Sequence, residues 1–203
     1  MNWIIFLKRQ EIPYHIYKLN QGDSIILKKN TAKNFDTIII LTGIMSLAKI
    51  FYNKELLPLA ILNKNDIVNQ NSINKTNYKI TALKSSYIIK LKEKSLYNKK
   101  IEKQCQHNII QYYQKTIKKY EETISIINQK NQTKRIILFI LLIFWKFGNI
   151  RKSKITISFK LTKKCIATMT STGINTVNKI IKKIHTNEKK TIKFLQIKKL
   201  RLV

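Results

Sequence analysis

The residues best suited to chemistry lie together between positions 161 and 184, where hydroxyl, amide and lysine side chains follow one another closely. Lysine neutralises phosphate groups, and in the major groove of a duplex asparagine can pair with adenine and lysine with guanine. This combination predicts contacts to double-stranded DNA. The candidate DNA-binding residues are Thr172, Gly173, Asn175, Thr176, Asn178, Lys179, Lys182 and Lys183.

The spacing within this stretch predicts two short helices joined by a turn. Thr162 is a good N-cap for a first helix that runs to about Met169, residues 170–173 form the turn, and Thr172 caps the second helix. The apolar residues of the second helix have the i, i+3, i+4, i+7 spacing of one buried face, at Val177, Ile180, Ile181 and Ile184. This is a helix-turn-helix pattern. Apolar residues then alternate over 192–195 and 200–203, which predicts a β-hairpin wing.

Charge is concentrated in the same part of the chain. The formal net charge is +30, and residues 128–203 hold 19 basic residues against a single acid, Glu188. A polyanion is the expected partner for such a segment. The charge has an alternative explanation in codon bias. Ile, Lys, Asn and Tyr, which have A/T-rich codons, number 38, 36, 19 and 9 and make up half of the 203 residues, as expected for an A/T-rich genome. The competing hypothesis is therefore a non-specific nucleic-acid-binding protein that is basic by codon drift.

Other kinds of chemistry find little support in the residue pattern. There is no Gly-rich phosphate loop, no Gly-x-Ser-x-Gly and no His-Glu-x-x-His, so we do not expect an enzyme. Cys105 and Cys165 give neither a disulfide framework nor a metal spacing, and no metal site is expected. The longest apolar run, Ile136–Trp145, has ten residues where a membrane span needs about 20, so we interpret it as a buried helix and expect no membrane partner. Trp3 and Trp145 are both predicted to be packing residues.

The elements that must position the candidate site begin with a run of short strands. Between residues 14 and 91, segments rich in Ile, Leu and Tyr alternate with turn signals about every ten residues, which is typical of an antiparallel sandwich or jelly roll. The expected strands are Tyr17–Leu19, Ile25–Leu27, Ile38–Leu41, Met45–Ile50, Leu56–Leu62 and Tyr87–Leu91.

Residues 102–133 change to helical spacing. Apolar residues step alternately by three and four, as in the a/d seam of a coiled coil, at Ile110, Tyr113, Ile117, Tyr120, Ile124 and Ile127. We expect this seam to be a homodimer interface; the alternative is that the stripe packs on its own domain. Ile136–Phe147 forms a second helix that ends at Gly148, and residues 151–159 form a short strand.

This order of elements resembles the cyclic-nucleotide receptor and fumarate–nitrate regulator (CRP/FNR) family of bacterial transcription factors. The matching pieces are Gly22-Asp23, Thr42-Gly43, residues 135–142 with Phe147-Gly148, and residues 161–184. The resemblance implies an α+β chain with three parts: a cyclic-nucleotide-binding-like β jelly roll over 1–101, a dimerisation helix over 102–134 and a winged helix-turn-helix over 135–203. Within the family, the chain is most similar to the nitrogen regulators of cyanobacteria and red-algal plastids.

That similarity implies a sequence-specific homodimeric regulator of nitrogen-responsive genes, in the plastid (chloroplast) stroma or in the cytoplasm of a bacterium or endosymbiont. RNA polymerase is a further candidate partner. The regulators it resembles sense 2-oxoglutarate, and the candidate effector residues here are Lys75, Lys79 and Glu121. A cyclic nucleotide is disfavoured, because residues 65–83 contain no Glu, Arg or Gly with which to hold its phosphate.

The chain departs from the family pattern at two positions of the motif. Ser171 stands where the family usually has a turn glycine, and Ile174 stands where it has a base-reading arginine. A later arginine of that helix is matched by Lys179. Loss of the arginine fork predicts weaker guanine readout, with a target sequence that either differs from the family's usual site or is read loosely.

Overall fold

The computed structural model describes residues 1–27, 36–69, 77–97, 103–151 and 154–191. The chain divides into two compact units, Met1–Glu121 and Glu122–Val203. The expected wing over 192–203 and the candidate residue Lys75 lie outside the described residues.

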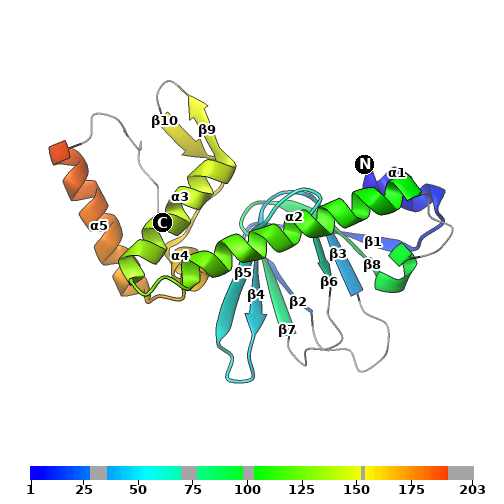
Figure 1. Ribbon diagram of the computed structural model, residues 1–203, viewed down its shortest axis with the longest axis horizontal. Helices are drawn as coiled ribbons and strands as arrows, with labels where there is room; N and C mark the ends of the chain where they lie inside the picture. Colours follow the sequence, from blue (N-terminus) through cyan, green and yellow to red (C-terminus); the bar gives the residue numbers. More distant parts are fainter. Residues whose placement is uncertain (28–35, 70–76, 98–102, 152–153, 192–203) are drawn as a thin grey trace. The chain divides into compact units, whose positions relative to one another are not determined.

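The first unit contains eight described strands and the helices that flank them (Figure 1). Its elements in chain order are α1 (Trp3–Arg9), β1 (Tyr14–Leu19), β2 (Ser24–Leu27), β3 (Asp36–Thr42), β4 (Met45–Ile50), β5 (Leu56–Leu62), β6 (Ile67–Asn69), β7 (Asn77–Ala82), β8 (Ser86–Lys92), the 3-10 helix η1 (Glu93–Tyr97) and α2 (Lys103–Ile127). The last residues of α2 belong to the second unit.

The strands form two four-stranded sheets with the orders β1-β8-β3-β6 and β2-β7-β4-β5. Every pairing is antiparallel, and β1 pairs with β8, β2 with β7, β3 with β6 and β4 with β5. A long hairpin folded back on itself in this way is a jelly roll. The antiparallel jelly roll expected from the strand spacing is therefore confirmed.

The inner strand β3 is buried on both of its faces, which explains its isoleucine run. Ile38 and Ile40 lie in the core between the sheets, together with Met45, Leu47 and Ile80. Ile39 points the other way, into a second cluster with Trp3, Leu7, Ile89 and Ile109. A strand covered on both faces has no reason to alternate with polar residues.

Helices α1 and α2 supply that second layer. Asn2 caps α1 by accepting a hydrogen bond from the Ile4 amide at 3.1 Å, and the helix buries Trp3, Phe6 and Leu7. Trp3 is buried, which confirms its predicted packing role. Its indole N–H donates to Asn65 Oδ1 at 3.2 Å. Helix α1, and the strands β6 and β7, had not been predicted from the sequence.

The second unit is a helical bundle with a small hairpin. It contains α3 (Gln132–Phe147), β9 (Gly148–Arg151), β10 (Lys154–Ile157), α4 (Lys163–Met169) and α5 (Ile174–Thr191). Helix α2 ends at Ile127, the last residue of the predicted seam, and Asn131 caps α3 by accepting from the Thr133 amide at 2.8 Å. The strand expected over 151–159 is present as the shorter β10, and it pairs antiparallel with β9, which was not predicted.

The apolar helix α3 is only partly buried. Ile136, Phe139 and Ile143 are in the core, whereas Ile137 and Leu141 lie exposed on the other side of the helix. Trp145 is 89% exposed, so its predicted packing role is wrong. The apolar run is continuous, but neighbours on one side of a helix bury only part of its circumference. Within the described residues no helix is both long and apolar enough to cross a membrane.

We predict that Gly43→Ala lowers the free energy of unfolding of the first unit by about 3 kcal/mol or more. Gly22→Ala should lower it by about 1–2 kcal/mol. Both glycines have left-handed backbones, with φ of +99° and +95°. A Cβ at Gly43 would lie 2.0 Å from Ser86 Oγ and 2.6 Å from Ser86 Cα, but a Cβ at Gly22 would meet nothing within 4 Å. Urea unfolding of the two variants separates steric overlap from backbone strain, and equal losses would contradict this prediction.

Candidate nucleic-acid interface and effector cavity

The turn between α4 and α5 is built from local hydrogen bonds. Thr162 caps α4 as expected, accepting from the Cys165 amide at 3.1 Å. Thr170, which is fully buried, donates from its hydroxyl to the Ile166 carbonyl at 2.8 Å, and the Thr172 amide donates to Ala167 at 2.9 Å. Ser171 adopts a left-handed φ of 48°. This is the position where a glycine would carry no such strain, and a serine there costs about 1–2 kcal/mol.

The expected cap at Thr172 is wrong. Helix α5 begins at Ile174, and the Gly173 carbonyl accepts its first backbone bond, from the Val177 amide at 3.1 Å. The Thr172 hydroxyl lies 2.8 Å from the Thr170 hydroxyl instead. Thr172 is therefore part of the turn, because both its hydroxyl and its backbone amide bond to residues that precede α5.

Helix α5 has the two faces that its spacing predicts. Val177, Ile180 and Ile181 are buried, with 0%, 8% and 7% of their surface exposed, and Ile184 is half-buried. Among the candidate DNA-binding residues, the exposed ones are Gly173, Asn175, Lys179, Lys182 and Lys183, and the half-buried ones are Thr172, Thr176 and Asn178. The two exposed lysine positions Lys179 and Lys182 lie about one turn apart.

Asn178 is placed less favourably for a nucleic-acid contact than Asn175. Its Oδ1 atom is buried and has no hydrogen-bond partner among the described residues. The amide of Asn178 therefore lies against the bundle, and Asn175 is the asparagine available on the outer face of α5.

The predicted seam on α2 divides between two directions. Ile110, Ile117 and Ile124, spaced seven residues apart, are 54%, 52% and 45% exposed. Tyr113 and Tyr120 pack against the clusters of their own jelly roll. Ile127 is half-buried. The three isoleucines are exposed and can contact a partner, whereas the two tyrosine rings already pack against the jelly roll.

Buried polar contacts fix α2 to the jelly roll. Lys119 Nζ makes an ion pair with the Asp66 carboxylate and donates to Asn63 Oδ1 at 2.6 Å. One turn earlier, the Ile67 amide donates to the Thr116 hydroxyl at 3.1 Å. The side chains of Lys119 and Asp66 are only 14% and 4% exposed. The position of the helix is thus set by paired groups that are largely buried.

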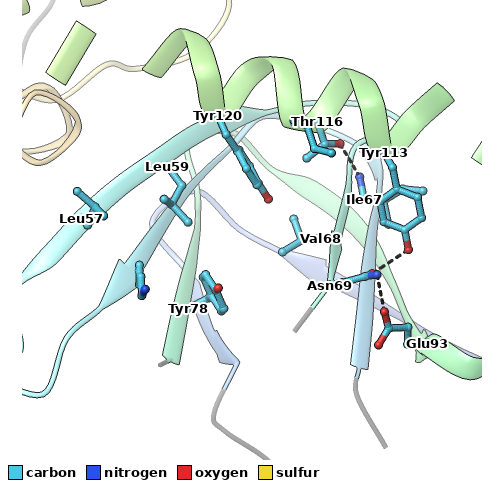
Figure 2. Close-up of a pocket in the computed structure, with 12 residues that line it drawn as sticks. Leu57, Leu59, Ile67, Val68, Asn69, Tyr78, Glu93, Tyr113, Thr116 and Tyr120 are labelled. Carbon is cyan, nitrogen blue, oxygen red and sulfur yellow. Dashed lines mark hydrogen bonds between the residues drawn. The ribbon is translucent and has the colours of Figure 1, made fainter. Parts of the chain in front are cut away.

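A cavity of about 520 Å³ lies beside these contacts, between α2 and the strands β4 to β7 (Figure 2). The strand register makes room for it: Leu47 pairs with Ala60 but Ala48 pairs with Pro58, so Leu59 is an extra residue in β5. Such a bulge changes which side chains share a face. Leu57 and Leu59 both line the cavity as a result.

The polar side of the cavity is a network centred on Asn69, as Figure 2 shows. The Tyr113 hydroxyl donates to Asn69 Oδ1 at 2.9 Å, and Asn69 Nδ2 donates to Glu93 Oε1 at 2.8 Å. Burial raises the pKa of the Glu93 carboxyl, and the hydrogen bond from Asn69 opposes this shift. Burial also raises the pKa of Tyr120, as do the nearby Tyr78 and Asp66, so the Tyr120 hydroxyl stays neutral at pH 7.

The candidate effector residues are not brought together here. Lys79 alternates with Tyr78 on β7, and of the two only Tyr78 lines the cavity. Glu121 is exposed on α2 and is not part of the lining. The lining instead contains Lys49 and Glu93, which had not been predicted because they come from segments distant in sequence. A lining with one lysine and one carboxylate does not offset the charge of a dianion, and 2-oxoglutarate binding stays a prediction.

The described residues contain no group of three His, Cys, Asp or Glu side chains that could hold a metal ion. Cys165 lies on α4, where burial raises the pKa of its thiol to about 12. A thiol with so high a pKa is a poor nucleophile and a poor metal ligand at neutral pH.

Comparisons with known proteins show similarity in structure only. No family model and no curated protein sequence matches the chain. A cyclic nucleotide-binding domain containing protein of Listeria monocytogenes superposes with a TM-score of 0.70 at 14% identity, covering 91% of this chain and 90% of that one. A CRP-family transcriptional regulator of Thermus thermophilus gives 0.66 at 11% identity, covering 84% and 85%. A CRP/FNR-family regulator of the same organism gives 0.63 at 13% identity, covering 85% and 87%.

Proposed function

We propose that this chain, which has the fold of CRP/FNR transcriptional regulators, is a homodimeric, sequence-specific DNA-binding regulator of transcription. The observation that carries the proposal is the division of α5. Its apolar face is buried in the second unit, while Asn175, Lys179 and Lys182 face outward from a helix that follows a tight turn. A recognition helix needs this division, because one face must pack while the other enters the major groove.

The surrounding charge supports the same function. Residues 128–203 carry 19 basic residues and one acid, and a duplex is the polyanion that an exposed helix of this diameter can enter. The second candidate, a non-specific nucleic-acid-binding protein, explains the charge equally well. The two candidates differ in sequence preference, because any surface helix that packs on one side carries its polar residues on the other.

The test is to incubate the purified protein with fragments of its own genome and sequence those retained at about 0.15 M salt. A regulator retains a small set that shares an inverted repeat, with half-sites about one helical turn apart. Retention in proportion to fragment length alone supports the non-specific alternative and contradicts our proposal.

The homodimer is proposed from the exposed isoleucines of α2. Three branched apolar side chains at heptad spacing on one helix are typical of the a positions of a coiled coil, where each packs against its equivalent in a second copy. Pairing through this face would also bring two α5 helices into one molecule, which an inverted repeat requires.

We predict that Ile117→Asp abolishes the dimer without unfolding the chain. The side chain is 52% exposed, so the single chain tolerates the change, but a two-fold axis would bring two carboxylates together at the seam. Gln111→Asp is the matched control, because it adds the same charge at an exposed site that is rotated by about 120° around the helix axis from Ile117. Sedimentation at micromolar concentration measures the outcome, and a dimer that survives Ile117→Asp would show that this face is not the interface.

We further propose that the cavity beside α2 is an effector site. The proposal rests on its size and on its contact with the helix that carries the seam, through Tyr113, Thr116 and Tyr120. Calorimetry with 2-oxoglutarate and with cyclic nucleotides tests it, and heat that is lost in Asn69→Leu would support binding there. If neither 2-oxoglutarate nor a cyclic nucleotide gives heat, neither is the effector. Nitrogen-responsive targets, contact with RNA polymerase and a plastid or bacterial location stay predictions from the sequence resemblance.

A further inference from the structure

One apolar side chain breaks the pattern of α5. Ile174, the first residue of the helix, is 46% exposed, whereas Val177, Ile180 and Ile181 are at most 8% exposed. Ile174 follows the exposed Gly173 directly and precedes the exposed Asn175. An aliphatic group is therefore displayed at the N-terminal end of the helix, next to Asn175 and on the same helix as Lys179 and Lys182.

The N-terminal residues of a recognition helix are those that reach base edges in the major groove. An isoleucine there has no hydrogen-bond donor or acceptor to offer. The major groove presents one apolar group to it, the C5-methyl of thymine, which cytosine and both purines lack. The neighbouring Asn175 has the amide that suits adenine. An isoleucine and an asparagine in succession favour an A/T-containing half-site.

We infer that Ile174 packs against the C5-methyl group of one thymine in each half-site and makes that position selective for thymine. This inference rests on the proposed function, since it requires α5 to enter the major groove. It goes further by assigning a base and a chemical group to a single side chain.

The experiment uses the duplex with the highest affinity among the retained genomic fragments. Each thymine is replaced in turn by deoxyuridine, which removes only the C5-methyl group, and the full-length protein is titrated at fixed salt. At one position per half-site we expect a loss of about fourfold, the size of one buried methyl group, and about 15-fold when both half-sites are changed. Ile174→Ala should bind the thymine and deoxyuridine duplexes equally.

Ile174→Asn provides a second variant of similar size if Ile174→Ala fails to fold. A deoxyuridine penalty that persists in both variants, or no penalty at any position, would overturn the inference while leaving sequence-specific binding intact. Retention of fragments without any sequence preference would instead overturn the proposed function, and this inference with it. The two failures are distinguishable because the second appears before any deoxyuridine is introduced.

Discussion

Replacing Lys119 with methionine is expected to destabilise the jelly roll by about 3–5 kcal/mol. The substitution keeps most of the length of the side chain but removes the cation that pairs with Asp66, whose surface is only 3% exposed. The Asp66 carboxylate would keep its bond from the Asn63 amide, at 2.6 Å, yet lose its counter-charge in a buried site. A buried charge left without its partner is among the most costly changes a fold can undergo.

The measurement is urea unfolding followed by circular dichroism. The matched control is Lys92→Met, which removes a lysine paired with Asp36 at 2.8 Å where the lysine side chain is 53% exposed, and we expect at most about 1 kcal/mol there. The double variant Lys119→Met with Asp66→Asn should recover part of the loss, because no buried charge is then left alone. Equal effects at Lys119 and Lys92 would show that α2 is not held by this pair.

The second large effect is expected in DNA binding. Lys179→Ala combined with Lys182→Ala should weaken binding to a retained fragment roughly 30-fold at 0.15 M salt, at about 1 kcal/mol for each lysine. Each phosphate contact contributes about one unit to the dependence of log affinity on log salt, so the slope should fall by about 2. Both lysines lie on the exposed face of α5, so the fold of the second unit should be preserved.

The control for this prediction is Lys64→Ala combined with Lys94→Ala. These lysines are exposed on the jelly roll, and their loss changes the net charge by the same amount. The control should change affinity and slope much less than the α5 pair. If the α5 variant keeps the wild-type slope, then α5 does not contact phosphates and the assignment of the recognition helix is wrong.

Local sequence pattern was sufficient for some elements of the fold and not for others. The strands around Ile38–Leu41 and Leu56–Leu62 and the two helices on either side of residues 170–173 were predicted because their own spacing favours one structure. Strands β6 and β7 were missed because they are short or rich in asparagine, lysine and threonine, and pair only with strands distant in sequence. Helix α1 was missed because seven residues give too little periodicity.

The candidate sites divide in the same way. The exposed face of α5 was predicted because its residues follow one another on a single helix, so their spacing alone defines that face. The lining of the cavity, which includes Lys49, Asn69 and Glu93, was not found because it is gathered from several strands, η1 and α2. Nothing in the separate segments marks these residues as neighbours.

The amino-acid sequence by itself determined the strand-rich first part, the heptad stripe of α2 and the two faces of α5, because periodicity is a property of contiguous residues. Only the tertiary structure decided which members of a stripe have partners. It turned Tyr113 and Tyr120 inward while Ile110, Ile117 and Ile124 stayed exposed, and it left Trp145 at the surface of an apolar helix. The reason is physical: periodicity specifies which side chains share a face, but burial depends on which surface packs against that face, and that surface comes from elsewhere in the chain or from a second copy.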